Sequence, residues 1–472
     1  MENKNKQPSV AVAAIGLILI IATIVVGIRM NFGTQMAVFC GAFVAVVVAM
    51  VVGCKWKQIE EALIAQINAV TVANIILIEV GILVGIWLIG GALPTLIYFG
   101  LGVISPKAIV PLAFVLCAFT SVCCGTSYGS AATMGLAMFG IGINMGINPG
   151  LLAGAVVSGS YFGDKMSPMS DTTNVAPAVS GTDLFSHISS MFYTTIPATI
   201  VCLIIYIILG LNAASTQAYD PSNIELMRST LAANFNISFI TVIPMILVLV
   251  LSVMKVPAIM AMGISIVVSV IFAAASQGAA LSDIFGAAYN GFTSDTGVAL
   301  VDTILNRGGA KSMVGTVYLV MFASVMSAAL KASGILDIVV NRGLKKFIKN
   351  RGLLVVFTMI ESYLVLLLTG NQTMALIIPG QTFGDTYDDM DTDRKVLSRS
   401  LEDSGTVACT LVPWSSASQY MSGVFGIAPM VFIPYHFLAM IVPVFSMICA
   451  FTGFGMWNSK GEKLWKSKAA KQ

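Results

Sequence analysis

The amino-acid sequence predicts an all-α polytopic membrane protein. Of its 472 residues, 57% are hydrophobic and 10% are charged, and the mean hydropathy is +0.90, whereas soluble domains carry about 25% charged residues. Several apolar runs reach the length of about 20 residues at which a helix crosses a bilayer. The alternating pattern of an outer-membrane barrel is absent. We therefore expect a multi-pass helical protein of the cell membrane, surrounded by lipid.

Charge and cysteine content exclude other classes. The net charge of +3 is small and spread over the loops and the C-terminal tail, so nucleic acid is not an expected partner. The eight cysteines lie mostly in apolar runs without metal-ligand spacing, which indicates reduced packing residues. Because the sequence shows no nucleophile with its base, no phosphate-binding loop and no zinc pattern, we expect neither an enzyme nor a bound cofactor.

Eight apolar spans are expected along the chain. They lie near residues 10–28, 35–53, 76–104, 188–210, 236–254, 257–278, 312–334 and 429–456. The first is too long for the core of a signal peptide and is expected to be retained. Amphipathic stretches that begin at Lys57 and Leu281 precede long spans, and we interpret both as interfacial helices.

Four other stretches are interrupted by glycine, proline and small polar residues. The interruptions are "CCGTSYGS" within 109–148, "GDKMSPMSDTTN" within 150–186, "TGNQT" within 352–384 and "VPWSSAS" within 396–427. Such residues favour neither a continuous helix nor a lipid-facing surface. Each half of the chain has the same order: a glycine-containing break, then acidic residues, then a proline-led polar run. We therefore expect one re-entrant hairpin and one broken helix in each half.

The basic residues predict the topology, because cytoplasmic loops are enriched in lysine and arginine. The basic positions fall on the cytoplasmic side if the chain makes about 10 spans and two re-entrant hairpins. The two repeats then have inverted topology. As an alternative, residues 70–108 cross the membrane twice instead of once. The expected organisation is N-terminal spans at 1–56, a first inverted repeat at 57–211, a connecting loop and spans at 212–280, a second inverted repeat at 281–456 and a basic cytoplasmic tail at 457–472.

Asp164 and Asp171 are the leading candidate site residues. An ionised side chain near the centre of a bilayer costs about 2.5–3.5 kcal/mol, so it persists where it faces a cavity, a partner or an ion. The hydroxyl and amide oxygens of the following residues, with the carbonyls of an unwound backbone, would suit a hard cation such as sodium. The alternative is an extramembrane loop in which "SDTTNVAP" caps the next helix.

Two neighbouring features leave alternatives open. Lys165 either neutralises Asp164, holds a carboxylate-bearing substrate, or occupies the cation site when the ion is absent. Thr126 and Ser127 either form the tip of a re-entrant hairpin or belong to a glycine- and serine-rich helix-packing face. The polar residues at "GNQT" in the second half favour the hairpin.

The sequence resembles the NhaC family of sodium/proton antiporters, within the ion transporter superfamily. The motifs that carry the likeness are "GDKMSPMSDTTN" with "GTDLF", "LTGNQTMALIIPGQTF" from Leu368, "SRSLEDSGTVACTLVPWSSASQY" from Ser398 and "LNRGGAKSM" from Leu305. The resemblance implies secondary active transport through inverted repeats. It places the ion or substrate site on Thr126, Ser127, Asp164, Asp171, Thr172, Thr173, Asn174, Asn371, Gln372, Thr373, Glu402, Asp403 and Ser415. From their own chemistry we add Lys165 and Ser170 to this site, and we expect Asp164, Asp171, Thr173 and Asn174 as candidate sodium ligands.

The leading functional hypothesis is exchange of sodium for protons. A buried aspartate would bind either a proton or sodium, and that competition would couple the two fluxes. The alternative is sodium- or proton-coupled exchange of a small carboxylate, as in malate/lactate exchangers that the family contains, or of an amino acid. A channel or receptor without coupling is a third hypothesis. The resemblance also allows a homodimer.

Overall fold

The computed structural model describes residues 9–30, 32–216, 221–254, 256–298, 301–302, 305–338 and 345–465. Within these ranges the chain is helical and forms no β-strand beyond two isolated bridges, which join Phe292 to Arg307 and Trp457 to Lys463. The predicted all-α class is confirmed. Some basic positions that support the predicted orientation lie outside the described residues: Lys4, Lys6, Lys255, Arg342 and residues 466–472.

Seven helices of the described chain are long and apolar enough to cross a membrane, or up to nine if each of two bent pairs is one span. The seven are α1 (Val10–Arg29), α2 (Thr34–Val51), α3 (Trp56–Ile89), α10 (Leu184–Thr216), α13 (Ala258–Gln277), α16 (Val314–Ser333) and α18 (Arg351–Thr369). The bent pairs are α11 (Pro221–Asn234) with η2 (Phe239–Val242) and α12 (Ile243–Val253), at 86°, and α22 (Pro429–Phe432) and η8 (Ile433–Tyr435) with α23 (Phe437–Thr452), at 45°. Each of the eight expected apolar stretches therefore contains a helix, and the protein is a multi-pass membrane protein.

One expected span is two helices. α3 ends at Ile89, and α4 (Ala92–Val103) begins after Gly90 and Gly91. Gly91 has a φ of 75°, a left-handed conformation that glycine adopts without steric strain. The prediction of a single span over 76–104 is therefore wrong. The amphipathic stretch from Lys57 is also not a separate helix but the first part of α3, whereas the stretch from Leu281 is the separate helix α14 (Leu281–Asn290).

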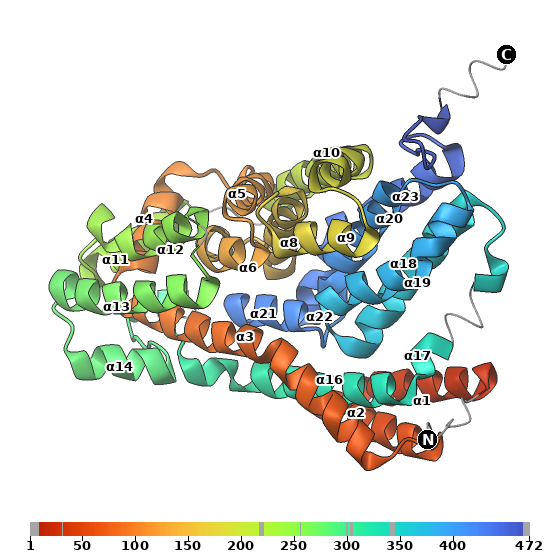
Figure 1. Ribbon diagram of the computed structural model, residues 1–472. Coiled ribbons are helices and arrows are strands. Elements are labelled where there is room, and N and C mark those ends of the chain that lie inside the picture. Colours follow the sequence, from red (N-terminus) through yellow and green to blue (C-terminus); the bar gives the residue numbers. More distant parts are fainter. Residues whose placement is uncertain are drawn as a thin grey trace.

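Most of the uninterrupted helices form a layer on one side of the interrupted ones. α10 instead packs on α5 (Ile109–Cys124), α8 (Pro149–Met166) and α23, and it lies on the opposite side in Figure 1. α1 packs on α2, α2 packs on α16, and α16, α13 and α14 all pack on α3. These helices occupy the lower part of the view in Figure 1, and the interrupted segments lie above them. Shorter elements complete the layer and its connections: η3 (Ala310–Met313), α17 (Ile335–Ile338) and η5 (Lys345–Phe347).

The first half contains a helical hairpin and a broken helix. The hairpin consists of α5 (Ile109–Cys124) and a return arm made of α6 (Ser127–Ser130), a π-helical turn η1 (Ala131–Gly135) and α7 (Leu136–Asn144). The broken helix consists of α8 (Pro149–Met166) and α9 (Asp171–Ser180). Ser127 contacts Asp164 near one end, and Gly142 packs on Leu152 near the other. The return arm is therefore antiparallel to α8.

The second half repeats this arrangement. Its hairpin is α18 and the return arm α19 (Gln372–Asp389), and its broken helix consists of α20 (Arg394–Leu401), a π-helical turn η6 (Glu402–Thr406), a 3₁₀ turn η7 (Val407–Leu411) and α21 (Ser416–Phe425). Gly405 packs on Leu376, and Leu401 packs on Gly380. The return arm is again antiparallel to the broken helix.

Contacts between the halves pair the last helix of each broken helix with the return arm of the other half. α9 packs along α19, with Val179 against Gly380. α21 lies along the other return arm, because the ring centroids of Tyr128 and Tyr420 are 4.0 Å apart and those of Phe139 and Phe425 are 4.9 Å apart. The residue boundaries of the repeats stay a prediction.

Candidate ion-binding site

Both hairpins turn at a left-handed glycine followed by a capping residue. α5 ends at Gly125 (φ 69°) and α18 ends at Gly370 (φ 61°). Thr126 then accepts a hydrogen bond from the backbone N–H of Gly129 at 3.4 Å, and Asn371 accepts one from the backbone N–H of residue 374 at 3.1 Å. Glycine satisfies the left-handed end of one helix and the capping side chain starts the next. The breaks predicted from "GTSYG" and "GNQT" are confirmed.

Each broken helix also restarts in the same way. Pro168 and Pro413 lie just beyond the ends of α8 and η7. Ser170 is then the N-cap of α9, and Ser415 is the N-cap of α21. Proline lacks the N–H that a continuing helix would need, so the proline-led runs interrupt the helices as expected.

The hairpin tip and the helix break of one half touch each other. A β-carbon added at Gly125 would lie 2.7 Å from Cβ of Met169, so no larger residue fits there without a shift. In the second half, the backbone N–H of Ser416 donates to the carbonyl of Gly370 at 3.1 Å. The two interruptions of each half, far apart in sequence, therefore form one unit.

Asp164 lies at the end of α8, at the first of these units. Its carboxylate is 7% exposed and accepts a hydrogen bond on each oxygen, from Ser127 at 2.7 Å and from Ser170 at 2.6 Å. Thr173 donates to the backbone carbonyls of Asp164 and Lys165, which are among the last carbonyls of α8. Hydrogen bonds from the hairpin tip and from the next helix thus fix the carboxylate at the break.

The breaks of both halves line one cavity of about 330 Å³. One wall is polar, and nine of the predicted site residues belong to it: Thr126, Ser127, Asp164, Ser170, Asp171, Thr172, Asn371, Gln372 and Thr373. Asp171 is more exposed than Asp164. The prediction that the two sets of breaks meet is therefore supported by the geometry.

The cavity also contains residues that sequence reasoning missed. Tyr128 and Ser416 belong to the polar wall, and both immediately follow predicted positions in their motifs. The opposite wall is apolar and comes from α3, α12 and α13: Val70, Val72, Ile76, Val248, Ala261 and Met262. These residues have no sequence signal, since they are ordinary members of apolar helices that the fold brings alongside.

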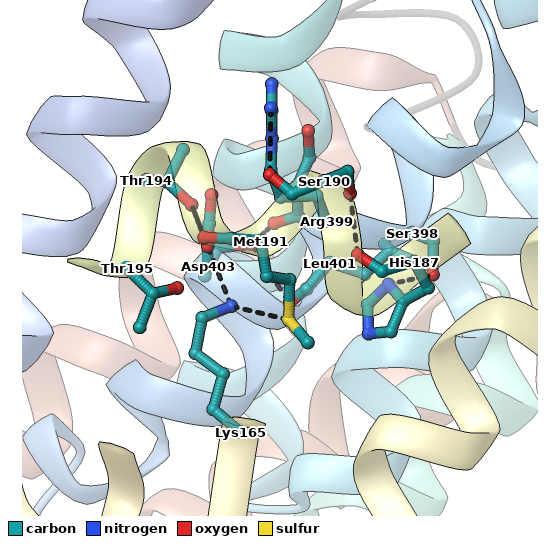
Figure 2. A network of polar contacts seen from close by, with 12 residues as sticks. Lys165, His187, Ser190, Met191, Thr194, Thr195, Ser398, Arg399, Leu401 and Asp403 are labelled. Atoms are coloured by element: carbon teal, nitrogen blue, oxygen red, sulfur yellow. Dashed lines mark hydrogen bonds and ion pairs between the residues drawn. The ribbon is translucent and has the colours of Figure 1, made fainter. Parts of the chain in front are cut away.

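Lys165 does not pair with the neighbouring Asp164. Its ammonium group forms an ion pair with Asp403 of the second half at 2.7 Å, and both side chains are 0% exposed. Thr194 of α10 donates to the same carboxylate at 3.1 Å, and the sulfur of Met191 lies 3.3 Å from the ammonium nitrogen. Figure 2 shows this network. Consecutive helical residues do not face one another, so Lys165 points away from the cavity.

Glu402 and Asp403 do not occupy the place that Asp164 has in the first half. Both are buried in the π-helical turn η6 and lie outside the cavity lining. Ser170 bonds Asp164 six residues earlier, and the Ser415 hydroxyl bonds the Cys409 carbonyl six residues earlier. Counted back from the prolines and the N-cap serines of the two breaks, the position of Asp164 corresponds to Cys409, whereas Glu402 and Asp403 lie earlier in the broken helix.

Three other predicted residues have structural contacts outside the cavity lining. Thr173 holds the end of α8, as described above. Asn174 donates to the carbonyls of Pro168 and Ser170, at 3.0 and 2.7 Å, and so closes the break. Ser415 caps α21. Among the candidate sodium ligands, Asp164 and Asp171 line the cavity, whereas Thr173 and Asn174 do not.

This arrangement suits a small hard cation. A carboxylate with hydroxyl groups on both sides provides anionic and neutral oxygens, which are the ligands such cations prefer. If Ser127 and Ser170 rotate their hydroxyl hydrogens away from Asp164, their oxygens become available to an ion. Inverted repeats with broken helices that meet in a polar cavity are typical of secondary transporters, and this is the class that the fold and site define.

The comparisons with known proteins agree with that class. Residues 159–454 match the model of the Na⁺/H⁺ antiporter family. The chain is 34% identical to the Na⁺/H⁺ antiporter NhaC of Alkalihalophilus pseudofirmus, over 85% of this chain and 86% of that protein. The chain therefore belongs to the Na⁺/H⁺ antiporter family, and the resemblance to NhaC proteins is confirmed.

Relatives of similar identity carry other names. The malate-2H⁺/Na⁺-lactate antiporter of Bacillus subtilis is 34% identical, over 90% of this chain and 91% of that protein. The arginine/ornithine antiporter ArcD of Halobacterium salinarum is 31% identical, over 97% of this chain and 95% of that protein. Membership of the family is thus compatible with more than one exchanged solute.

Proposed function

We propose that this protein is a secondary active transporter of the cell membrane that exchanges sodium ions for protons. The position of Asp164 carries the proposal: a nearly buried carboxylate at a helix break, held by two hydroxyl groups, in a cavity that the interruptions of both halves line. The family to which the chain belongs supports the same activity.

In the proposed cycle, sodium binds the carboxylate of Asp164 together with the hydroxyl oxygens of Ser127 and Ser170. Asp171, which is more exposed, attracts cations into the cavity. Sodium and a proton exclude one another because each neutralises the same excess negative charge in the protein interior. The inverted halves rock about the cavity so that it opens to one side of the membrane and then to the other.

Sodium-driven proton movement in proteoliposomes tests this proposal. A sodium gradient is imposed, and a trapped dye reports the internal pH. We expect Asp164→Asn to abolish the sodium-driven pH change. The matched control is Asp183→Asn, which removes an aspartate that bonds the backbone N–H of Ser186 and is not part of the cavity lining. Full activity in Asp164→Asn would refute the assignment.

A second candidate function is coupled exchange of a small carboxylate or amino acid. The cavity favours it in one respect: about 330 Å³ with an apolar wall lies within the range of pockets for organic ligands, and it exceeds the room that a sodium ion with a few waters needs, at about 30 Å³ per water. The N-termini of α19 and α21 lie at the cavity and would favour a carboxylate group.

The same proteoliposomes separate the two functions. The sodium-driven pH change is recorded with and without malate, lactate, arginine and ornithine. A change without any organic solute supports sodium/proton exchange. A strict requirement for one of the four solutes supports the second candidate.

A further inference from the structure

A second group of charged side chains lies behind the Asp164 cavity, where the two halves meet. Lys165 of the first half and Asp403 of the second form the buried ion pair described above. Glu402, the residue before Asp403, is also 0% exposed. Charges interact strongly in a region of low dielectric constant. A sodium ion at Asp164 would therefore change the electrostatic energy of Lys165, Glu402 and Asp403.

Glu402 has an unusual environment for a buried carboxyl group. Neither of its oxygens has a hydrogen-bond partner in the part of the chain that the structure describes. The hydroxyl of Thr406, one turn further along, is close but is not in hydrogen-bonding geometry. Burying an ionised carboxylate without partners is strongly unfavourable, whereas a protonated carboxyl group tolerates such a place far better.

The charges of the region are balanced by one additional positive charge. Lys165 and Arg399 are basic, and both are fully buried. Asp164, Glu402 and Asp403 are acidic. If these five groups are ionised and Glu361 of α18, which is also buried, is neutral, one negative charge is in excess, and either one sodium ion or one proton neutralises it. A net charge inside the membrane is costly, so the region favours holding one or the other.

The hydrogen bonds indicate which acid takes the proton. Both oxygens of Asp164 accept hydrogen bonds from hydroxyl groups, which suits an ionised carboxylate. Asp403 is ion-paired with Lys165 and accepts a further bond from Thr194. Glu402 has neither kind of contact among the described residues. The proton therefore fits Glu402 best.

We propose that the exchanged proton resides on Glu402, apart from the sodium site at Asp164, and that the two cations exclude each other through charge and not by sharing one carboxylate. The inference rests on the proposed sodium/proton exchange. Sodium binding to ionised Asp164 releases one proton from Glu402 to water, so the charge of the interior is the same before and after. The ion pair of Lys165 and Asp403 stays formed throughout.

The elements packed against η6 are α8, α9, α18, α19, α20, η7 and α23. Lys165 and Asp164 of α8, and Asp403 of η6 itself, act electrostatically on Glu402. The buried or half-buried titratable side chains on these elements are Tyr161, Asp164, Lys165, Arg351, Glu361, Tyr363, Tyr387, Arg394, Lys395, Arg399, Cys409 and Cys449, together with exposed Asp171 of α9 and with His187 of α10, the helix whose Thr194 bonds Asp403. Glu361 accepts a hydrogen bond from Thr382 at 3.0 Å, which makes it a suitable comparison.

Proton release on sodium binding tests the inference with purified protein in detergent. Sodium chloride is added in weakly buffered solution containing a pH indicator, with choline chloride as the ionic-strength control, and sodium binding is measured by calorimetry. We expect wild-type protein to release about one proton per sodium bound. In the pH range where the proton competes, its affinity for sodium should fall about tenfold for each unit by which the pH is lowered. We expect Glu402→Gln to bind sodium with little dependence on pH and to release no proton.

Glu361→Gln is the matched control, since it also removes a buried carboxyl group from the second half. We expect it to release protons as the wild-type protein does. If wild-type protein binds sodium and releases no proton, sodium/proton exchange itself is wrong. If the wild-type protein and Glu402→Gln release equal numbers of protons, the exchange stands and the role of Glu402 is refuted.

A spectroscopic measurement covers the case in which Glu402→Gln does not fold. Sodium-induced infrared difference spectra report the loss of a protonated carboxyl group. We expect the wild-type protein to lose such a band on sodium binding, and the conservative variant Glu402→Asp to shift the frequency of that band. A band that Glu402→Asp leaves unshifted belongs to another residue and overturns the inference.

Discussion

Replacing Lys165 by methionine removes the positive charge of the buried ion pair but keeps an unbranched side chain of similar size. Lys165 and Asp403 are 2.7 Å apart and both 0% exposed, so the variant leaves a buried carboxylate with the hydroxyl of Thr194 at 3.1 Å. Removing one partner of a buried pair typically costs about 3–5 kcal/mol. The variant therefore tests how strongly this contact holds the two halves together.

Protonation of Asp403 limits the loss. An ordinary aspartate has a pKa of about 3.9, and holding it protonated costs about 1.4 kcal/mol per pH unit above that value, which is about 4 kcal/mol at pH 7. We therefore expect Lys165→Met to lower the free energy of unfolding by about 3–4 kcal/mol at pH 7. Because the carboxyl group is protonated more easily at low pH, the loss should shrink as the pH falls.

The double variant Lys165→Met/Asp403→Asn removes the unpaired charge. We expect it to recover about 2 kcal/mol or more of the loss, and a double-mutant cycle gives the interaction free energy. The assay is denaturant unfolding in detergent micelles, followed at pH 7 and at pH 5. If the two single losses add to that of the double variant within about 0.5 kcal/mol, the pair does not stabilise the contact between the halves.

Three further predictions concern the breaks and the cavity. Gly125→Ala and Gly370→Ala both place a side chain on left-handed backbone, which costs about 1–2 kcal/mol. Thermal unfolding should show a larger loss of stability for Gly125→Ala, because its β-carbon would overlap its neighbour. Equal losses of stability in the two variants would contradict this. Ser170→Ala removes a hydrogen bond to ionised Asp164, worth about 1.5–3 kcal/mol, and should weaken sodium binding about 10- to 100-fold in calorimetry; unchanged affinity would exclude Ser170 from the site. Asp171→Asn should slow sodium uptake, more so at low salt, while saturating transport remains, because an exposed charge steers ions without being essential; loss of transport at saturating sodium would make Asp171 a ligand.

Local features of the structure follow from short stretches of sequence. "GTSYG" and "GNQT" predicted the two hairpin turns, because glycine followed by a capping residue ends one helix and starts another within five residues. Pro168 and Pro413 predicted the helix breaks for a similar reason. The recurrence of these signals in both halves predicted that the breaks meet, and the cavity lining agrees. One local signal was missed: the glycines after α3 divide an expected span.

The sequence did not predict which charged side chains pair with one another. Lys165 follows Asp164 in the chain, yet helix geometry turns it away, and its partner is on another helix of the other half. In the sequence, Glu402 and Asp403 take the same place in the order of motifs as Asp164. In the structure they begin a π-helical turn and lie further from the break of their helix than Asp164 lies from the break after α8. The apolar cavity wall from α3, α12 and α13 likewise arises only when separate helices pack.

The sequence by itself determined that the chain enters a membrane as helices and where those helices break, since hydropathy and backbone preference act over a few residues. Only the tertiary structure decided which buried charges meet. That outcome depends on the register and rotation of helices distant in sequence, and a shift of one residue turns a helical side chain by about 100° to face another neighbour.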